Sequence, residues 1–151
     1  MEDRTVATNR QARYLYDIIE TYEAGIALTG PEVKSVRAGR VNLKDSFASV
    51  DGNKELFLYN CHISTYEHTS SFKPDPERKR KLIMHKAEIM RLLGKTTQKG
   101  LTLVPLKMYF KRGLCKIELA LGKGKKKYDK RAKIIEKEAR RQLREIKSHK
   151  K

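Results

Sequence analysis

The sequence contains no tryptophan, only two cysteines, and no apolar run near the roughly 18 residues that a membrane-spanning helix requires. Its first ten residues, MEDRTVATNR, are polar and include acids, which is unlike a secretory signal peptide. Cys61 and Cys115 both lie in strand-like runs, so we expect two reduced, buried thiols rather than a disulfide framework. Together these absences predict a cytoplasmic protein without a membrane partner.

The sequence is also poor in the groupings that catalysis and metal binding require. Its four histidines show no paired metal-ligand spacing, either with each other or with the two cysteines. No nucleophile elbow, carboxylate pair or catalytic triad spacing is present. Gly94-Lys95-Thr96 is similar to the end of a phosphate-binding loop, but Ile89 stands where the first glycine of that loop should be. We therefore expect neither an enzyme nor a cofactor or metal site.

Positive charge is what the sequence has in excess. The 151 residues include 35 Lys or Arg against 18 Asp or Glu, a formal net charge of +17. Such a charge favours a polyanionic partner, and nucleic acid is the first candidate. An anionic membrane surface is the second, but binding there usually needs a bulky apolar face with Trp or Phe, and the chain has no Trp.

The charge is concentrated at the C-terminus, where residues 122–151 contain fourteen Lys or Arg and four Asp or Glu. We divide the chain into a body, residues 1–121, and a basic tail, residues 122–151. A helix placed on 128–148 would carry a narrow apolar stripe that includes Ile135, Leu143 and Ile146. Because so narrow a stripe buries little surface, the tail is expected to be loose alone and helical against an anionic surface.

The body is typical of a small β protein. Alternating apolar residues predict a long strand over 13–28, a hairpin that pairs 46–50 with 55–63, and a second hairpin over 101–121. Short helices are expected at 31–38 and at 82–93, the second ending at Gly94. Five or six strands in so short a chain predict a mainly β fold, an antiparallel OB-like barrel with two or three short peripheral helices.

Two local features favour contacts with RNA. The run Arg78-Lys79-Arg80-Lys81 is interpreted as a set of phosphate contacts, since further basic runs accompany it in the chain. Tyr128 lies among cations beyond the last expected strand, where an aromatic ring can stack on an unpaired base. A solvated loop end and an ordinary exposed tyrosine remain the alternative interpretations.

Five segments of the chain carry a resemblance to a known family: NRQARYLYDIIETYEAGIALTGPEVKSVRAG, NLKDSFA, LYNCHISTYEH, DPERKRKLIMHKAEIMRLLGKTTQKGLTLVPLKMYFKRG and GKGKKKYDKRA. They resemble, in order along nearly the whole chain, small protein B (SmpB), the tmRNA-binding or SsrA-binding family of bacterial trans-translation. After Ala132 the likeness is confined to a basic, amphipathic character.

The resemblance implies a binding protein without chemistry of its own. It implies an OB-like barrel that binds the tRNA-like domain of tmRNA and enters stalled ribosomes whose decoding site lacks an intact codon. It further implies a tail that lies as a helix along the empty mRNA channel, against ribosomal RNA. Elongation factor Tu and alanyl-tRNA synthetase are implied only indirectly, through tmRNA, and we expect the protein to be a monomer.

The resemblance and the tail pattern together predict two sets of site residues. The tmRNA-binding set is Asn9, Glu32, Lys34, Arg37, Asn42, Lys44, Lys95, Lys99, Lys123, Lys125 and Lys126. The decoding-centre and tail set is Tyr128, Asp129, Lys130, Arg131, Ile135, Arg140, Leu143 and Ile146. Glu32 is unusual on an RNA face because it repels phosphate. It could accept hydrogen bonds from a guanine or order a neighbouring basic residue, besides capping its helix in a box with Thr29.

Charge and fold class alone leave a second interpretation open. A ribosomal protein or a ribosome-assembly factor with a basic extension would show the same charge and a similar barrel. An RNA-processing enzyme would need a carboxylate or histidine cluster, which the sequence does not offer.

Overall fold

A computed structural model of the chain describes residues 4–65, 75–125 and 141. These residues form nine strands and three helices. The strands are β1 (Arg4–Thr8), β2 (Tyr16–Ile26), β3 (Val41–Asn42), β4 (Phe47–Val50), β5 (Leu56–Tyr59), β6 (His62–Ile63), β7 (Arg80–Ile83), β8 (Thr102–Lys111) and β9 (Leu114–Gly124). The helices are α1 (Arg10–Leu15), α2 (Gly30–Arg37) and α3 (Lys86–Gln98).

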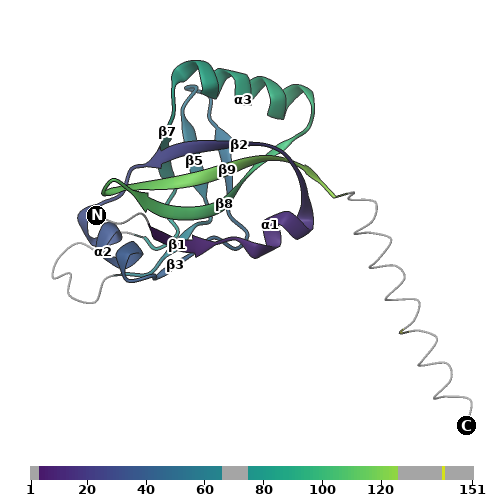
Figure 1. Cartoon of the computed structure of the whole chain (residues 1–151). Helices are drawn as coiled ribbons and strands as arrows, with labels where there is room; N and C mark the ends of the chain where they lie inside the picture. The colour runs from purple at the N-terminus through teal and green to yellow at the C-terminus, as the bar shows by residue number, and fades with distance from the viewer. Residues whose placement is uncertain (1–3, 66–74, 126–140, 142–151) are drawn as a thin grey trace, which may run out of the picture.

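Seven strands form one antiparallel sheet in the order β1-β8-β4-β5-β7-β2-β9. Because β9 also pairs with β8, the sheet closes on itself as a barrel, and β1 adds to the outer edge of β8 (Figure 1). Closure pairs strand edges that would otherwise be exposed. The predicted mainly antiparallel β-barrel with two or three short helices is therefore confirmed.

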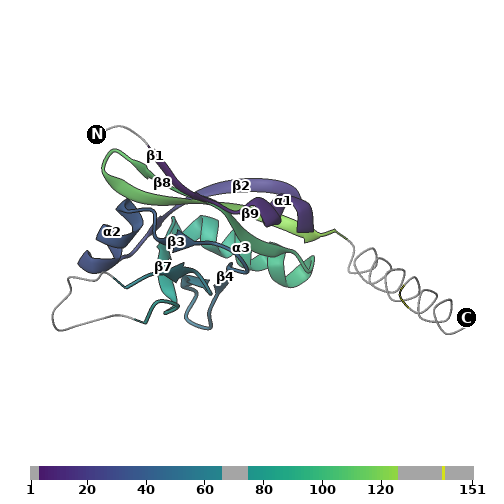
Figure 2. The ribbon, with the colours of Figure 1, turned by 90° about the horizontal axis from the view of Figure 1, so that it is seen from below.

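The barrel interior is apolar because successive strand residues point to opposite faces. Leu56 and Leu58 of β5, Leu82 of β7, and Ile117 and Leu119 of β9 are all buried in one cluster. Helix α3 lies across one end of the barrel and buries Ile89 and Leu92 in the same cluster (Figure 1). Helices α1 and α2 lie at opposite ends of the molecule in two perpendicular views (Figures 1 and 2).

The expected strand over 13–28 is wrong at its start, since α1 occupies Arg10–Leu15 and β2 begins at Tyr16. Tyr14, within the expected strand, is instead on α1 and is 68% exposed. A register shift between Ile18 and Glu20 also interrupts β2. A bulge adds one residue to the strand, so side chains beyond it point to the opposite face from the one that the alternation predicts. The alternating residues of the sequence therefore do not form one continuous face of β2.

The expected helix over 82–93 is wrong at both ends. Leu82 belongs to β7, and α3 begins at Lys86 and passes through Gly94 to Gln98. The glycine with positive φ is Gly100, at 63°, directly after the C-terminal cap Lys99. A left-handed glycine past the last turn is a common helix terminator, so the stop signal lies six residues beyond the one predicted.

The first expected hairpin is correct for β4 and β5 but extends too far. Phe47 pairs with Tyr59 and Val50 pairs with Leu56, as an antiparallel hairpin requires. The chain then turns at Asn60, whose φ is 60°, and β6 pairs with β3 instead of continuing the hairpin. The second hairpin, β8 with β9, is confirmed.

A candidate nucleic-acid interface

The N-terminus of α2 is joined to the chain before β7 by a buried group of charges. Glu32 is 2% exposed and accepts hydrogen bonds from the side chains of Arg78 and Arg80, with Arg78 Nε 3.0 Å and Arg80 Nε 2.8 Å from its Oε2 atom. Its Oε1 atom accepts from the Thr29 amide at 2.9 Å, while the Thr29 hydroxyl accepts from the Glu32 amide at 3.4 Å. We call Glu32, Arg78 and Arg80 the Glu32 cluster.

Arg80 is the centre of this cluster and is fully buried. Besides Glu32, its guanidinium donates to three backbone carbonyls, those of Cys61 at 2.6 Å, Pro76 at 3.0 Å and Arg78 at 3.1 Å. A planar guanidinium suits this role because its donors are held in a fixed fork. The cluster therefore fixes the segment before β7 against α2 and the end of β5.

This geometry corrects the interpretation of the run Arg78-Lys79-Arg80-Lys81. A phosphate contact by Arg80 is excluded by its burial, and Arg78 is turned toward Glu32. Lys79 and Lys81 are the exposed members of the run. Of the roles considered for Glu32, the structure shows two, capping α2 and ordering basic neighbours, and leaves its carboxylate too buried to meet a guanine.

The stability of the protein should depend on the ionisation of Glu32. Burial alone would raise the pKa of this carboxyl group, but hydrogen bonds from Arg78, the Thr29 amide and Arg80 hold the pKa below its ordinary value of 4.5. The unfolded chain therefore takes up this proton first, so the stabilisation is complete above about pH 4.5 and is lost as the pH falls through the lowered pKa. We expect Glu32→Gln to weaken this acid dependence, measured by urea unfolding from about pH 7 to about pH 3.

A matched control is Glu55→Gln, which removes an exposed acid paired with Lys81 at 3.9 Å. The acid dependence of Glu32→Gln should be weaker than that of this variant. An equal dependence in Glu32→Gln and the wild-type protein would show that the buried carboxyl group does not titrate with folding.

The Glu32 cluster orients a basic surface on α2 and the chain that follows it. Lys34 and Arg37 are exposed on α2, and the Arg37 guanidinium lies 5.6 Å from the ring centre of Phe110. Arg4 of β1 donates to the Arg37 carbonyl at 2.6 Å. We call this surface the α2 face and include in it the exposed residues Arg4, Lys34, Arg37, Asn42 and Lys44.

The predicted residues Asn42 and Lys44 follow α2, with Asn42 as the last residue of strand β3 and Lys44 two positions after it. The Asn42 side-chain oxygen accepts from the Lys44 amide at 2.9 Å, which holds a tight turn there. Both side chains are exposed. Four of the predicted tmRNA-binding residues are thus accessible in this region of the molecule.

A second group of predicted residues lies at α1 and the end of β9. Asn9 donates through Nδ2 to the Pro105 carbonyl at 2.9 Å and through its amide to the Leu106 carbonyl at 2.7 Å. It therefore fixes the junction between β1 and α1 on β8. Lys123 and Lys125 are exposed, and the Lys125 amide donates to the Leu15 carbonyl at 2.7 Å.

The third group is on α3. Lys95 Nζ lies 2.8 and 2.9 Å from the two carboxylate oxygens of Glu20, so much of its charge is offset within the protein. Lys99 is exposed at the C-terminal cap of the helix. The structure thus places the described tmRNA-binding residues of the prediction in three separate regions. The remaining one, Lys126, lies outside the described residues, and so does the whole decoding-centre and tail set.

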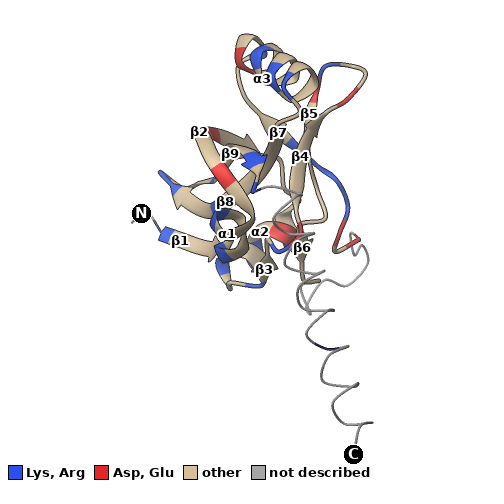
Figure 3. Cartoon of the chain, turned by 90° about the vertical axis from the view of Figure 1, so that its right-hand side faces the viewer, with Lys and Arg blue, Asp and Glu red and all other residues tan. Residues whose placement is uncertain are grey.

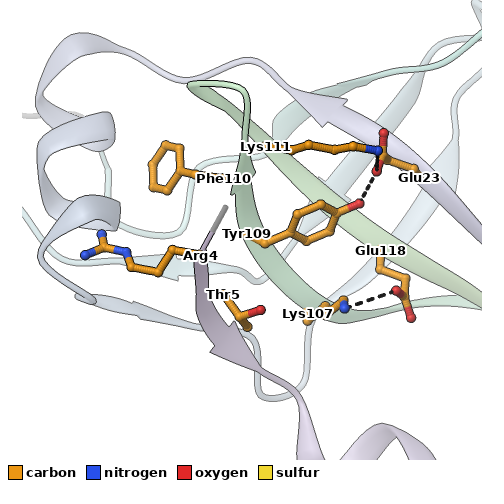
Figure 4. Close-up of a pocket in the computed structure, with 8 residues that line it drawn as sticks. All are labelled: Arg4, Thr5, Glu23, Lys107, Tyr109, Phe110, Lys111 and Glu118. Atoms are coloured by element: carbon orange, nitrogen blue, oxygen red, sulfur yellow. Dashed lines mark hydrogen bonds and ion pairs between the residues drawn. The ribbon is translucent and has the colours of Figure 1, made fainter. Parts of the chain in front are cut away.

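A hollow in the described part of the chain is lined by residues of β1, β2, β8 and β9. It has a volume of about 320 Å³ and mixes charges of both signs (Figure 4). Glu23 accepts a hydrogen bond from the Tyr109 hydroxyl and lies 3.4 Å from Lys111 Nζ, while Lys107 and Glu118 are 3.7 Å apart. Because both acids offset nearby lysines, the hollow is a poor place for a phosphate.

Lysine and arginine are spread over several elements rather than gathered on one (Figure 3). Across residues 4–65, 75–125 and 141, no group of three or more His, Cys, Asp or Glu is arranged to hold a metal ion. No helix in that part of the chain is both long enough and apolar enough to cross a membrane.

Known proteins and structures share this sequence and fold. The family described as SmpB protein matches residues 6–149. The SsrA-binding protein of Pelotomaculum thermopropionicum is 59% identical over 143 residues, covering 95% of this chain and 93% of that protein. That of Carboxydothermus hydrogenoformans is 60% identical over 141 residues, covering 93% and 94%. A solved chain described under "tmRNA-SmpB: a journey to the center of the bacterial ribosome" is 58% identical, with a TM-score of 0.67, covering 82% of this chain and 87% of that one.

Proposed function

Because the chain belongs to the SmpB protein family, we infer that it binds tmRNA and acts in trans-translation, the rescue of stalled ribosomes. The main support is the sequence identity of 59% and 60% to two SsrA-binding proteins over nearly the whole chain. The solved relative, described with tmRNA and the ribosome, supports both partners. This agreement favours tmRNA binding over the ribosomal-protein alternative.

The division of labour within the chain is part of the proposal. The barrel, residues 1–121, binds the tRNA-like domain of tmRNA through the α2 face, with Lys123 and Lys125 extending the basic surface from the end of β9. The tail enters the empty mRNA channel as a helix, with Tyr128 to Arg131 at the decoding centre. The protein works in the cytoplasm as a monomer and performs no catalysis. The exposure of the α2 face supports the first of these assignments.

Affinity for the isolated tRNA-like domain tests the α2 face. Each phosphate that a Lys or Arg neutralises contributes roughly 0.7–0.9 to the slope of log affinity against log salt concentration. Replacing both Lys34 and Lys44 by alanine should therefore reduce that slope by about 1.4–1.8. Gel-shift titrations at four salt concentrations measure the change.

Lys86→Ala serves as the control, because Lys86 is an exposed cation on α3, outside the α2 face. Its slope should stay near that of the wild-type protein. An unchanged slope in the Lys34 and Lys44 double variant would indicate that the α2 face contacts the ribosome and not the tRNA-like domain. Failure of the unaltered protein to bind the domain at low salt would contradict the proposed function itself.

A further inference from the structure

Three aromatic rings lie together on the outer side of the β4–β5 hairpin. Phe47 and Tyr59 are paired in register, and their rings are stacked with centres 5.2 Å apart and planes 16° apart. Phe57 lies two positions before Tyr59 on β5 and therefore on the same side of the strand. A chain with four Phe and seven Tyr thus places three of these rings on one short hairpin.

These rings are not part of the barrel core. The residues that alternate with them on β5, Leu56 and Leu58, are fully buried and fill the interior. Phe47 is 38% exposed, and Phe57 and Tyr59 are only partly covered. The sequence LFLY therefore supplies one apolar face to the core and a second, aromatic face to the outside.

Cations border the rings on the neighbouring strand. Lys79 Nζ lies 4.6 Å from the ring centre of Phe57, in the range of a cation–π contact. Lys81 of β7 is the register partner of Phe57, and its side chain is 52% exposed. Glu55 lies 3.9 Å from Lys81 Nζ at the edge of this surface and offsets part of its charge, so Lys79 is the main cation beside the rings. We call the surface made by Phe47, Phe57, Tyr59, Lys79 and Lys81 the aromatic face.

The aromatic face lies apart from the hollow lined by β1, β2, β8 and β9. Figure 2 shows β4 and β7 on the side of the barrel away from β1, β2 and β8. Lys79 stands between Arg78 and Arg80, both of which bond to Glu32, so the cationic edge is fixed by the Glu32 cluster. A fixed platform loses little conformational entropy when it binds a ligand.

We propose that the aromatic face stacks unpaired nucleobases of a single-stranded RNA segment, whose phosphates lie against Lys79 and Lys81. Rings that present a flat, partly exposed surface beside lysines match both parts of a nucleotide, since bases stack on rings and phosphates pair with cations. A protein partner is the less favoured occupant, because lysine is depleted at protein–protein interfaces relative to the rest of the surface. The proposal goes beyond the assignment of the α2 face to the tRNA-like domain.

Equilibrium binding of the full chain to a fluorescent RNA oligonucleotide of about ten nucleotides tests the proposal. Tyr59→Leu keeps an apolar side chain of β5 but removes the ring, and it should weaken binding roughly tenfold. Tyr59→Phe keeps the ring and should bind like the wild-type protein. The matched probe is an abasic oligonucleotide of the same length, which retains every phosphate, and its affinity should be the same for all three proteins.

Thermal unfolding of each variant checks that the barrel is intact, and Phe47→Leu provides a second ring removal at the other member of the stacked pair. If both leucine variants bind the normal oligonucleotide with wild-type affinity, the proposal is overturned. That result is the one expected if the aromatic face binds a protein instead of RNA. Equal losses on the normal and abasic probes would overturn it too. Binding of the tRNA-like domain to the unaltered protein, measured in parallel, tests the proposed function separately.

Discussion

Replacing Arg80 by methionine is expected to lower the free energy of unfolding by about 3–5 kcal/mol. The guanidinium is fully buried and bonds to Glu32 and to three backbone carbonyls. Methionine fills much of the same volume but leaves the buried Glu32 with one arginine fewer and the carbonyls without their donor. An unsatisfied buried polar group costs its full desolvation, which is why the loss should exceed that of an ordinary hydrogen bond.

Arg78→Met is the matched control for this prediction. The Arg78 side chain is 32% exposed, and Glu32 would keep Arg80 after its removal. Its loss should cost about 1 kcal/mol, because water can replace part of the interaction. Chemical denaturation at neutral pH compares the two variants. A cost for Arg80→Met no greater than that for Arg78→Met would show that burial does not strengthen the central contact.

Removing residues 132–151 should abolish peptide tagging on stalled ribosomes while leaving affinity for the tRNA-like domain within a few-fold of wild type. The reason is the proposed division of labour, in which the barrel holds tmRNA and the tail occupies the mRNA channel. A reconstituted translation system with a message that lacks a stop codon measures tagging, and gel shifts measure binding. A hundredfold loss of binding, about 2.7 kcal/mol, would contradict the division.

A point substitution separates the helix of the tail from its charge. Ala139→Pro should also block tagging, because proline within a helix costs roughly 3 kcal/mol but leaves every charge in place. Ala139→Gln, the control, retains helix propensity and should tag nearly as well as wild type. Full tagging by the proline variant would mean that the tail acts as a flexible polycation.

The elements that were correctly predicted carry their signal locally. The β8–β9 hairpin follows from the alternation next to Arg112-Gly113, whose φ values of 53° and 78° are those of a tight hairpin turn. Helix α2 follows from the Thr29 and Glu32 capping box, which the structure contains in full. In both cases, neighbouring residues determine the conformation with little help from the rest of the chain.

The missed features depend on residues that are far apart. Glu32 contacts Arg78 and Arg80, which are 46 and 48 positions away in the sequence. No pattern in the residues next to Glu32 or next to the arginines indicates that they form a buried cluster. Strand β7 was not predicted because its first residues are basic, a composition typical of a loop. Arg80 is buried because Glu32 and three backbone carbonyls accept its hydrogen bonds. The aromatic face had a detectable signal, since LFLY places large apolar residues on both sides of a strand.

The last described residues of β9 determine where the tail starts. Strand β9 pairs with β2 as far as Gly124, and the next residue, Lys125, is bonded to Leu15. If the barrel docks on tmRNA as proposed, residues 126–151 enter the channel from this origin, and these 26 residues would span at most about 90 Å when fully extended. Their entry would then be an intramolecular step with a high effective concentration. The place where β9 ends would thereby help to set the rate at which these residues reach their site.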